Sequence, residues 1–61
     1  MITLTGIEPG SKLRIVGDIT AEVLEIVNDE WVQVRLIEVP EGGPPVGTAE
    51  LCHATDIIEI V

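Results

Sequence analysis

Aromatic side chains are almost missing from this sequence. It contains no tyrosine and no phenylalanine, and Trp31 is its single tryptophan. Aromatic-lined grooves for proline-rich helices and cages for methylated lysine both need several aromatic side chains. Surfaces that bind single-stranded nucleic acid also stack bases on such side chains. The composition therefore excludes these three kinds of binding site.

Positive charge is also scarce. Lys12, Arg14 and Arg35 stand against eleven acidic residues, which gives a net charge of −8. Such a surface repels phosphate backbones and anionic lipid headgroups. We therefore expect no nucleic-acid partner and no membrane-surface binding, whereas a basic protein partner is compatible. A requirement for solubility would explain the same charge.

Cysteine occurs once, at Cys52, so no disulfide can form within one chain. A lone thiol is typical of a reducing compartment, and we predict a cytoplasmic protein. Met1 is followed by neither a basic region nor a long apolar run, so we predict no signal peptide and no membrane insertion. A length of 61 residues predicts one domain spanning residues 1–61.

Aliphatic side chains, in contrast, are abundant. Isoleucine, valine and leucine make up 22 of the 61 residues. Isoleucine and valine are branched at the β-carbon and favour strands, which predicts an all-β protein with an aliphatic core. One small domain cannot bury so much aliphatic surface, so the surplus predicts self-association or docking on a larger assembly.

Periodicity and turn residues divide the chain into short strands. Strands are predicted over residues 12–16, 19–27, 31–39, 48–52 and 57–61, with a short lead-in over 2–4 and one turn of 3-10 helix over 53–56. The apolar positions in 19–27 also fit an amphipathic helix, and this alternative stays open. The segment 40–47, PEGGPPVG, is predicted to be a surface loop because proline and glycine disrupt regular structure.

Alternation assigns faces to two of these strands. Leu13 and Ile15 are predicted to face the core. Val32, Val34 and Leu36 form a second inward row, which places Trp31, Gln33, Arg35 and Ile37 on the other face. Asn28 and Asp29 tolerate the positive φ of a tight hairpin turn, which we predict before Trp31.

Three segments resemble the photosystem I reaction-centre subunit IV family. Residues 10–16, GSKLRIV, are similar to its opening strand, residues 32–36, VQVRL, to its central strand, and residues 55–61, TDIIEIV, to its closing segment. The loop over 40–47 falls where that family carries a long, variable loop. The resemblance implies a small SH3-like barrel of about five short antiparallel strands, with a 3-10 turn before the last strand.

The same resemblance implies an accessory subunit. Members of that family help to dock the acidic electron carrier ferredoxin through basic side chains. In this chain the basic side chains are Lys12, Arg14 and Arg35. An electron-transport subunit that docks a redox partner is therefore one functional hypothesis.

Cys52 and His53 are the only adjacent pair of potential metal ligands. Neighbouring side chains of a strand point to opposite faces, so the two would not converge on one ion. Structural zinc also needs four ligands. We therefore predict no catalytic residue, no metal and no cofactor. An oligomeric enzyme or metal site built around Cys52 and His53 at a subunit interface remains an alternative.

The favoured hypothesis is a non-catalytic protein-interaction module or small accessory subunit. Trp31 is its best candidate contact, because interface tryptophans often anchor a partner, although a tryptophan can also cap a core. Trp31, Ile37 and Val39 are predicted to be the exposed apolar groups. The 40–47 loop either recognises a partner or simply connects two strands. The predicted partner-binding residues are Trp31, Arg35, Ile37, Val39, Pro44 and Pro45.

Overall fold

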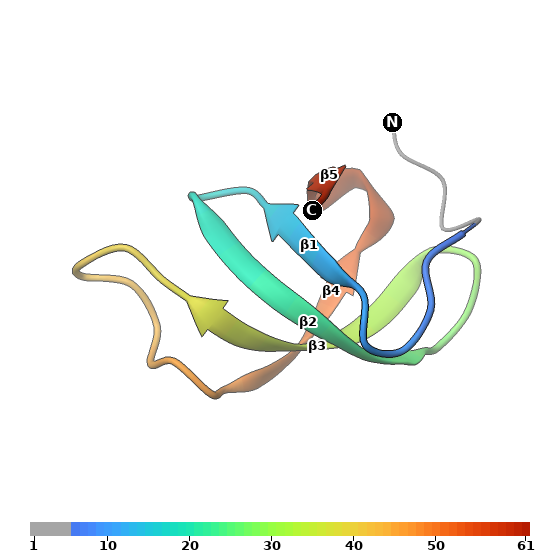
Figure 1. Cartoon of the computed structure of the whole chain (residues 1–61), viewed down its shortest axis with the longest axis horizontal. Helices are drawn as coiled ribbons and strands as arrows, with labels where there is room; N and C mark the ends of the chain where they lie inside the picture. Colours follow the sequence, from blue (N-terminus) through green and yellow to red (C-terminus); the bar gives the residue numbers. More distant parts are fainter. Residues whose placement is uncertain (1–5) are drawn as a thin grey trace.

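The computed structural model describes residues 6–61 as one antiparallel sheet (Figure 1). The lead-in predicted over residues 2–4 lies outside the described residues. The elements are β1 (Lys12–Ile15), β2 (Ile19–Ile26), β3 (Trp31–Glu38), β4 (Ala49–His53), the 3-10 helix η1 (Ala54–Asp56) and β5 (Ile57–Ile60).

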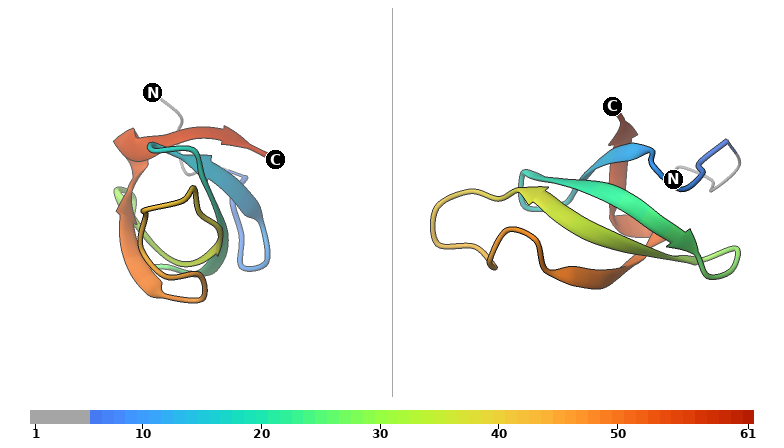
Figure 2. Two further views of the ribbon diagram at one scale, coloured as in Figure 1. Left: turned by 90° about the vertical axis from the view of Figure 1, so that its left-hand side faces the viewer. Right: turned by 60° about the horizontal axis from the view of Figure 1, so that its bottom comes forward.

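The strand order is β4-β3-β2-β1-β5, and every neighbouring pair is antiparallel. The sheet curls round its own apolar face (Figure 2), and η1 joins its two end strands, β4 and β5, directly. Among residues 6–61 no ladder of hydrogen bonds pairs β4 with β5, so the sheet is open at this point. The predicted all-β class is confirmed, with its five short antiparallel strands and a 3-10 turn before the last.

Bulges produce this curl. The register of β2 against β3 shifts between Thr20 and Ala21 and again between Val23 and Glu25. The register of β1 against β5 shifts between Arg14 and Ile15. A bulge bends and twists the strand that carries it, which allows one sheet to fold over its own inner face.

The core lies inside this curl and follows the predicted alternation. Val32, Val34 and Leu36 of β3 are at most 1% exposed, and Leu13 of β1 is fully buried. The whole buried apolar set is aliphatic apart from one thiol: Ile7, Leu13, Ile15, Ala21, Val23, Val32, Val34, Leu36, Cys52, Ala54 and Ile57. The inward rows predicted for residues 12–16 and 31–39 are confirmed.

The structure decides between strand and helix for residues 19–27. They form β2, so the helical alternative is wrong. The apolar run that suggested a helix is explained by the second bulge, since Val23 lies opposite Val34 and Glu25 opposite Gln33. Leu24 is therefore the extra residue, and its place between two register positions interrupts strict alternation.

The two hairpin turns use different chemistry. In the first turn, Gly17 and Asp18 adopt consecutive positive φ angles of 85° and 59°. In the second, the Asn28 side-chain oxygen accepts hydrogen bonds from the backbone N–H groups of Glu30 and Trp31, at 2.8 and 3.0 Å. The hairpin predicted before Trp31 is present, but positive φ occurs at Asp18 and not at Asn28 or Asp29. An asparagine that accepts bonds from the following backbone supplies the turn instead.

The loop between β3 and β4 has no regular structure, as predicted, and projects from the sheet (Figure 1). Its base is fixed by backbone hydrogen bonds, from Leu36 N–H to the Thr48 oxygen at 3.0 Å and from Gly47 N–H to the Leu36 oxygen at 2.8 Å. No helix in the described part of the chain is long and apolar enough to cross a membrane.

Replacing Val34 by alanine tests the importance of the core. Val34 is fully buried, so losing two methyl groups should lower the free energy of unfolding by about 2 kcal/mol. The matched change Val46→Ala removes the same atoms from a side chain that is 64% exposed, and should change stability by less than about 0.5 kcal/mol. Urea denaturation followed by Trp31 fluorescence measures both. Equal effects would contradict the assignment of the core.

Candidate interaction surface

The outer surface of β3 and β4 presents a continuous row of side chains. Three directly opposed pairs define it: Trp31 with His53, Gln33 with Leu51, and Arg35 with Ala49. We call these six residues the β3–β4 face. Opposed residues of a strand pair share one side of the sheet, and the Val32–Cys52 pair between them lies on the inner side.

Two apolar side chains stand out on this face. Trp31 is 38% exposed and Leu51 is 62% exposed. They are diagonal neighbours across the β3–β4 pair, because Leu51 lies two residues from the partner of Trp31. Diagonal neighbours are within reach of an aromatic side chain. The two residues therefore form one apolar patch.

The Trp31 side chain is held in place by the ring of His53, which is itself held by Thr55. The ring of His53 meets it edge to face, with the ring centroids 4.7 Å apart and the planes at 84°. His53 is itself fixed, because its Nδ1 accepts a hydrogen bond from the Thr55 backbone N–H at 3.2 Å and lies 2.8 Å from Thr55 Oγ1. His53 thus caps the first turn of η1 while it positions Trp31.

These bonds also assign the histidine tautomer. A backbone N–H can only donate, so Nδ1 of His53 is the acceptor and the ring proton lies on Nε2. Nε2 faces the Glu30 carboxylate at 3.6 Å. Glu30 therefore lies beside the apolar patch and contributes negative charge to its border.

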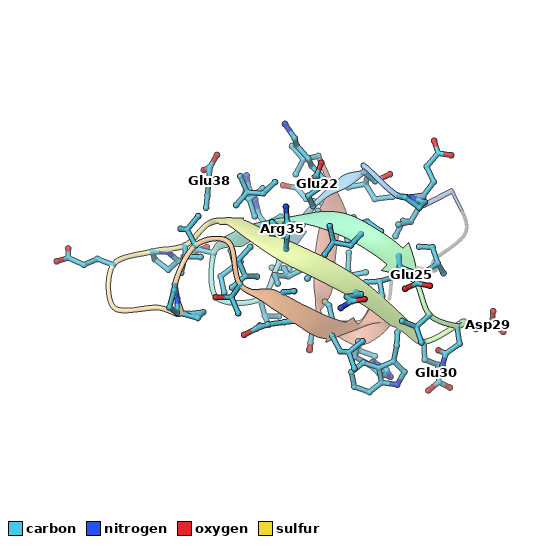
Figure 3. The ribbon with its side chains drawn as sticks, turned by 90° about the horizontal axis from the view of Figure 1, so that it is seen from below. Glu22, Glu25, Asp29, Glu30, Arg35 and Glu38 are labelled. Atoms are coloured by element: carbon cyan, nitrogen blue, oxygen red, sulfur yellow. The ribbon has the colours of Figure 1, made fainter. Side chains whose placement is uncertain are left out.

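Acidic side chains border the β3–β4 face. Glu25 and Glu22 of β2 lie opposite Gln33 and Arg35. Figure 3 shows Glu25, Asp29 and Glu30 gathered toward the β2–β3 hairpin, Glu22 next to Arg35, and Glu38 toward the other end. The apolar patch therefore has a border of mainly negative charge.

The predicted partner-binding residues do not all lie on this face. Trp31 and Arg35 are exposed there. Pro44 and Pro45 are exposed on the loop, where the Pro45 oxygen accepts a hydrogen bond from Thr48 Oγ1 at 2.7 Å. The loop prolines and the β3–β4 face are thus separate candidate contacts.

Ile37 and Val39 were wrongly predicted to be exposed. Ile37 is the bulged residue of β3, since Leu36 lies opposite Ala21 and Glu38 opposite Thr20, and it is partly buried. Val39 is partly buried and packs against the core.

Gly43 covers Val39 from the loop side, because a Cβ at Gly43 would overlap a methyl group of Val39. The loop therefore folds back over Val39, which the sequence pattern did not indicate.

Sequence reasoning missed most of the exposed apolar groups. Besides Trp31, the large ones among residues 6–61 are Val16, Val27, Val46, Leu51, Ile58, Ile60 and Val61. Alternation within 48–52 could have identified Leu51, because it has the opposite parity to Cys52. Ile58 directly follows the buried Ile57, so alternation places it on the outward side as well.

Cys52 and His53 point to opposite sides of β4. Cys52 is buried on the inner side, while His53 lies on the outer side against Trp31. Burial raises the pKa of the Cys52 thiol, and the nearby Asp56 and Glu50 carboxylates raise it further. A raised pKa disfavours the nucleophilic thiolate. Within residues 6–61 no three His, Cys, Asp or Glu side chains are grouped so that they could hold a metal ion.

Comparison with known proteins gives no relative: no family model, no curated protein and no solved structure matches the chain.

The Cys52 thiol should make stability depend on alkaline pH. The folded state binds this proton more tightly than the unfolded state, whose thiol has a pKa near the ordinary value of 9.0. The stabilisation is complete below that value and is lost as pH rises above it. Thermal unfolding between neutral pH and about pH 10.5 should show a steeper loss for the native chain than for Cys52→Ala. Parallel curves would contradict this.

Removing the His53 ring should loosen Trp31. His53→Ala deletes the edge-to-face contact, which is worth about 1 kcal/mol, and also the cap of η1. We expect a red shift of the tryptophan emission and faster quenching by acrylamide. Glu30→Gln is the control, because its contact with His53 is solvent-exposed and contributes little. An unchanged emission in His53→Ala would show that Trp31 is held by other contacts.

Proposed function

We propose that this chain is a non-catalytic protein-interaction module, or a small accessory subunit, that binds a basic protein partner through its β3–β4 face. The observation that carries the proposal is the exposed apolar patch of Trp31 and Leu51 with its acidic border. Tryptophan in a well-packed patch is the residue most often found to dominate binding energy. The acidic border then selects partners of opposite charge.

Pre-organisation supports this role for Trp31. A free side chain loses conformational entropy when a partner immobilises it, which weakens binding. Trp31 is already positioned by the His53 ring, and His53 is held by Thr55. The Trp31 side chain has therefore already lost much of its conformational freedom on folding, so a partner that immobilises it causes little further loss of entropy.

Charge supports a basic partner in particular. A lysine or arginine of the partner would gain from the carboxylates of Glu25 and Glu30, and also from the face of the Trp31 ring. The same net charge of −8 disfavours nucleic acid and anionic lipid as partners.

The two alternatives have weaker support. Docking of an acidic electron carrier needs accessible cations, and Arg14 is ion-paired with Glu59 at 3.3 Å while Arg35 lies opposite Glu22. An enzyme built around Cys52 and His53 would need both side chains on one side of β4. The arrangement of these side chains therefore favours the interaction module.

Capture of partners from the native cell extract tests the proposal. Immobilised chain should retain a basic protein, and Trp31→Ala and Leu51→Ala should each reduce its retention at least about tenfold. Val46→Ala, which alters an equally exposed side chain on the loop, should retain it as the native chain does. Retention should also fall as salt rises. A partner that survives both substitutions on the β3–β4 face would contradict the proposal.

A further inference from the structure

The β1–β5 pair carries exposed aliphatic side chains away from the β3–β4 face. Ile58, Ile60 and Val61 are 52%, 49% and 66% exposed, and Val16, which follows β1, is 50% exposed. Val16 N–H donates to the Asp56 oxygen and Val61 N–H to the Lys12 oxygen, so these ends of the β1–β5 pair are held together. We call these four residues the β5 edge.

The backbone of β5 can accept another strand. β5 is an end strand, and β1 is its only partner among the described strands. It lies at the periphery of the sheet in Figure 2. Proteins protect such an edge by short length, bulges, proline or charge, and β5 has the first two, since it is four residues long and its register shifts against β1. β5 contains no proline, and its one charge, Glu59, is ion-paired with Arg14 at 3.3 Å.

Charge makes this edge unusual in the molecule. Strands β1 and β5 together carry two cations, Lys12 and Arg14, and one carboxylate, Glu59, a net charge of +1. The rest of the chain carries one cation and ten carboxylates, a net charge of −9. The other end strand, β4, carries Glu50 and no cation. A second copy of this acidic chain therefore meets the least repulsion at the β1–β5 pair.

We propose that two copies of the chain associate through antiparallel pairing of β5 with β5 around a two-fold axis. The pairing joins the two sheets, satisfies the outward backbone groups of β5, and covers Ile58 and Ile60 of both copies. Because β5 has only four residues, the interface is small and the dimer is weak, in the micromolar range or above. The inference is independent of partner binding at the β3–β4 face, since the two surfaces share no residue.

Sedimentation equilibrium from about 10 µM to about 1 mM tests the dimer. The mass of the native chain should rise from monomer toward dimer across this range. Ile58→Lys places a charge on the β5 edge and should keep the chain monomeric. Leu51→Lys is the matched control, because Leu51 is similarly exposed on the other end strand, and it should still dimerise.

The response to salt distinguishes dimerisation from the binding of a basic partner. Screening reduces repulsion between two acidic copies, so dimerisation should strengthen as sodium chloride rises. Binding of a basic protein at the β3–β4 face should weaken over the same range. Lys12→Glu should weaken the dimer more than Arg35→Glu, which makes the same change of charge on β3.

Three results would overturn the proposal. One is a native chain that stays monomeric to the highest concentration. Another is a dimer that Leu51→Lys abolishes and Ile58→Lys does not. The third is protection of the β5 amides from hydrogen exchange in dilute, monomeric protein, which would mean that another part of the chain, such as residues 1–5, covers the edge. If Ile58→Lys fails to fold in a urea titration, Lys12→Glu and the amide exchange of the native chain decide.

Discussion

The fold depends on one constraint: a single sheet must cover its own apolar face. The described residues contain no second layer that could pack against it, so the sheet has to curl. The central strand β3 supplies Val32, Val34 and Leu36 to the inside of that curl. A small curled sheet encloses little volume, and short aliphatic side chains fill it in well-defined rotamers. The lack of phenylalanine and tyrosine is consistent with so narrow an interior.

The same constraint determines what is left outside. Each strand sends alternate side chains outward, where no other layer covers them. Trp31 lies on the outward parity of β3, against His53. Apolar groups also remain at the two ends of the sheet, where Leu51 and Ile58 lie on end strands. The exposed apolar surfaces therefore follow from the architecture.

Sequence reasoning succeeded where periodicity is strict and failed where bulges interrupt it. The inward rows of β1 and β3 and the side of Cys52 could be read from alternation alone. Ile37 could not, because it occupies a bulge whose position depends on how β2 pairs with β3. Bulges arise from pairing between distant segments, and local residue patterns do not contain that information.

The side chain that contacts Trp31 within the fold could not be identified from the sequence either. Along its own strand, the outward neighbours of Trp31 are Gln33 and Arg35. The register of β3 with β4 instead brings in His53, 22 positions away in the chain, and sets Arg35 opposite Glu22. Cross-strand neighbours become visible only when the register is known. The outward position of Trp31 could thus be predicted, while the contacts that hold it required the structure.

Because the domain is small, covering the β3–β4 face or the β5 edge affects its stability. A domain of about 60 residues buries only about 60% of the surface that its unfolded chain exposes, so its net stability is small. This chain has no second cysteine for a disulfide, and its core contains no buried polar side chain among the described residues. Any molecule that covers the β3–β4 face or the β5 edge binds only the folded state and therefore stabilises it. The aliphatic side chains that one curled sheet cannot bury contribute little to the stability of the isolated chain, and the proposed association at either surface would add stability by covering them.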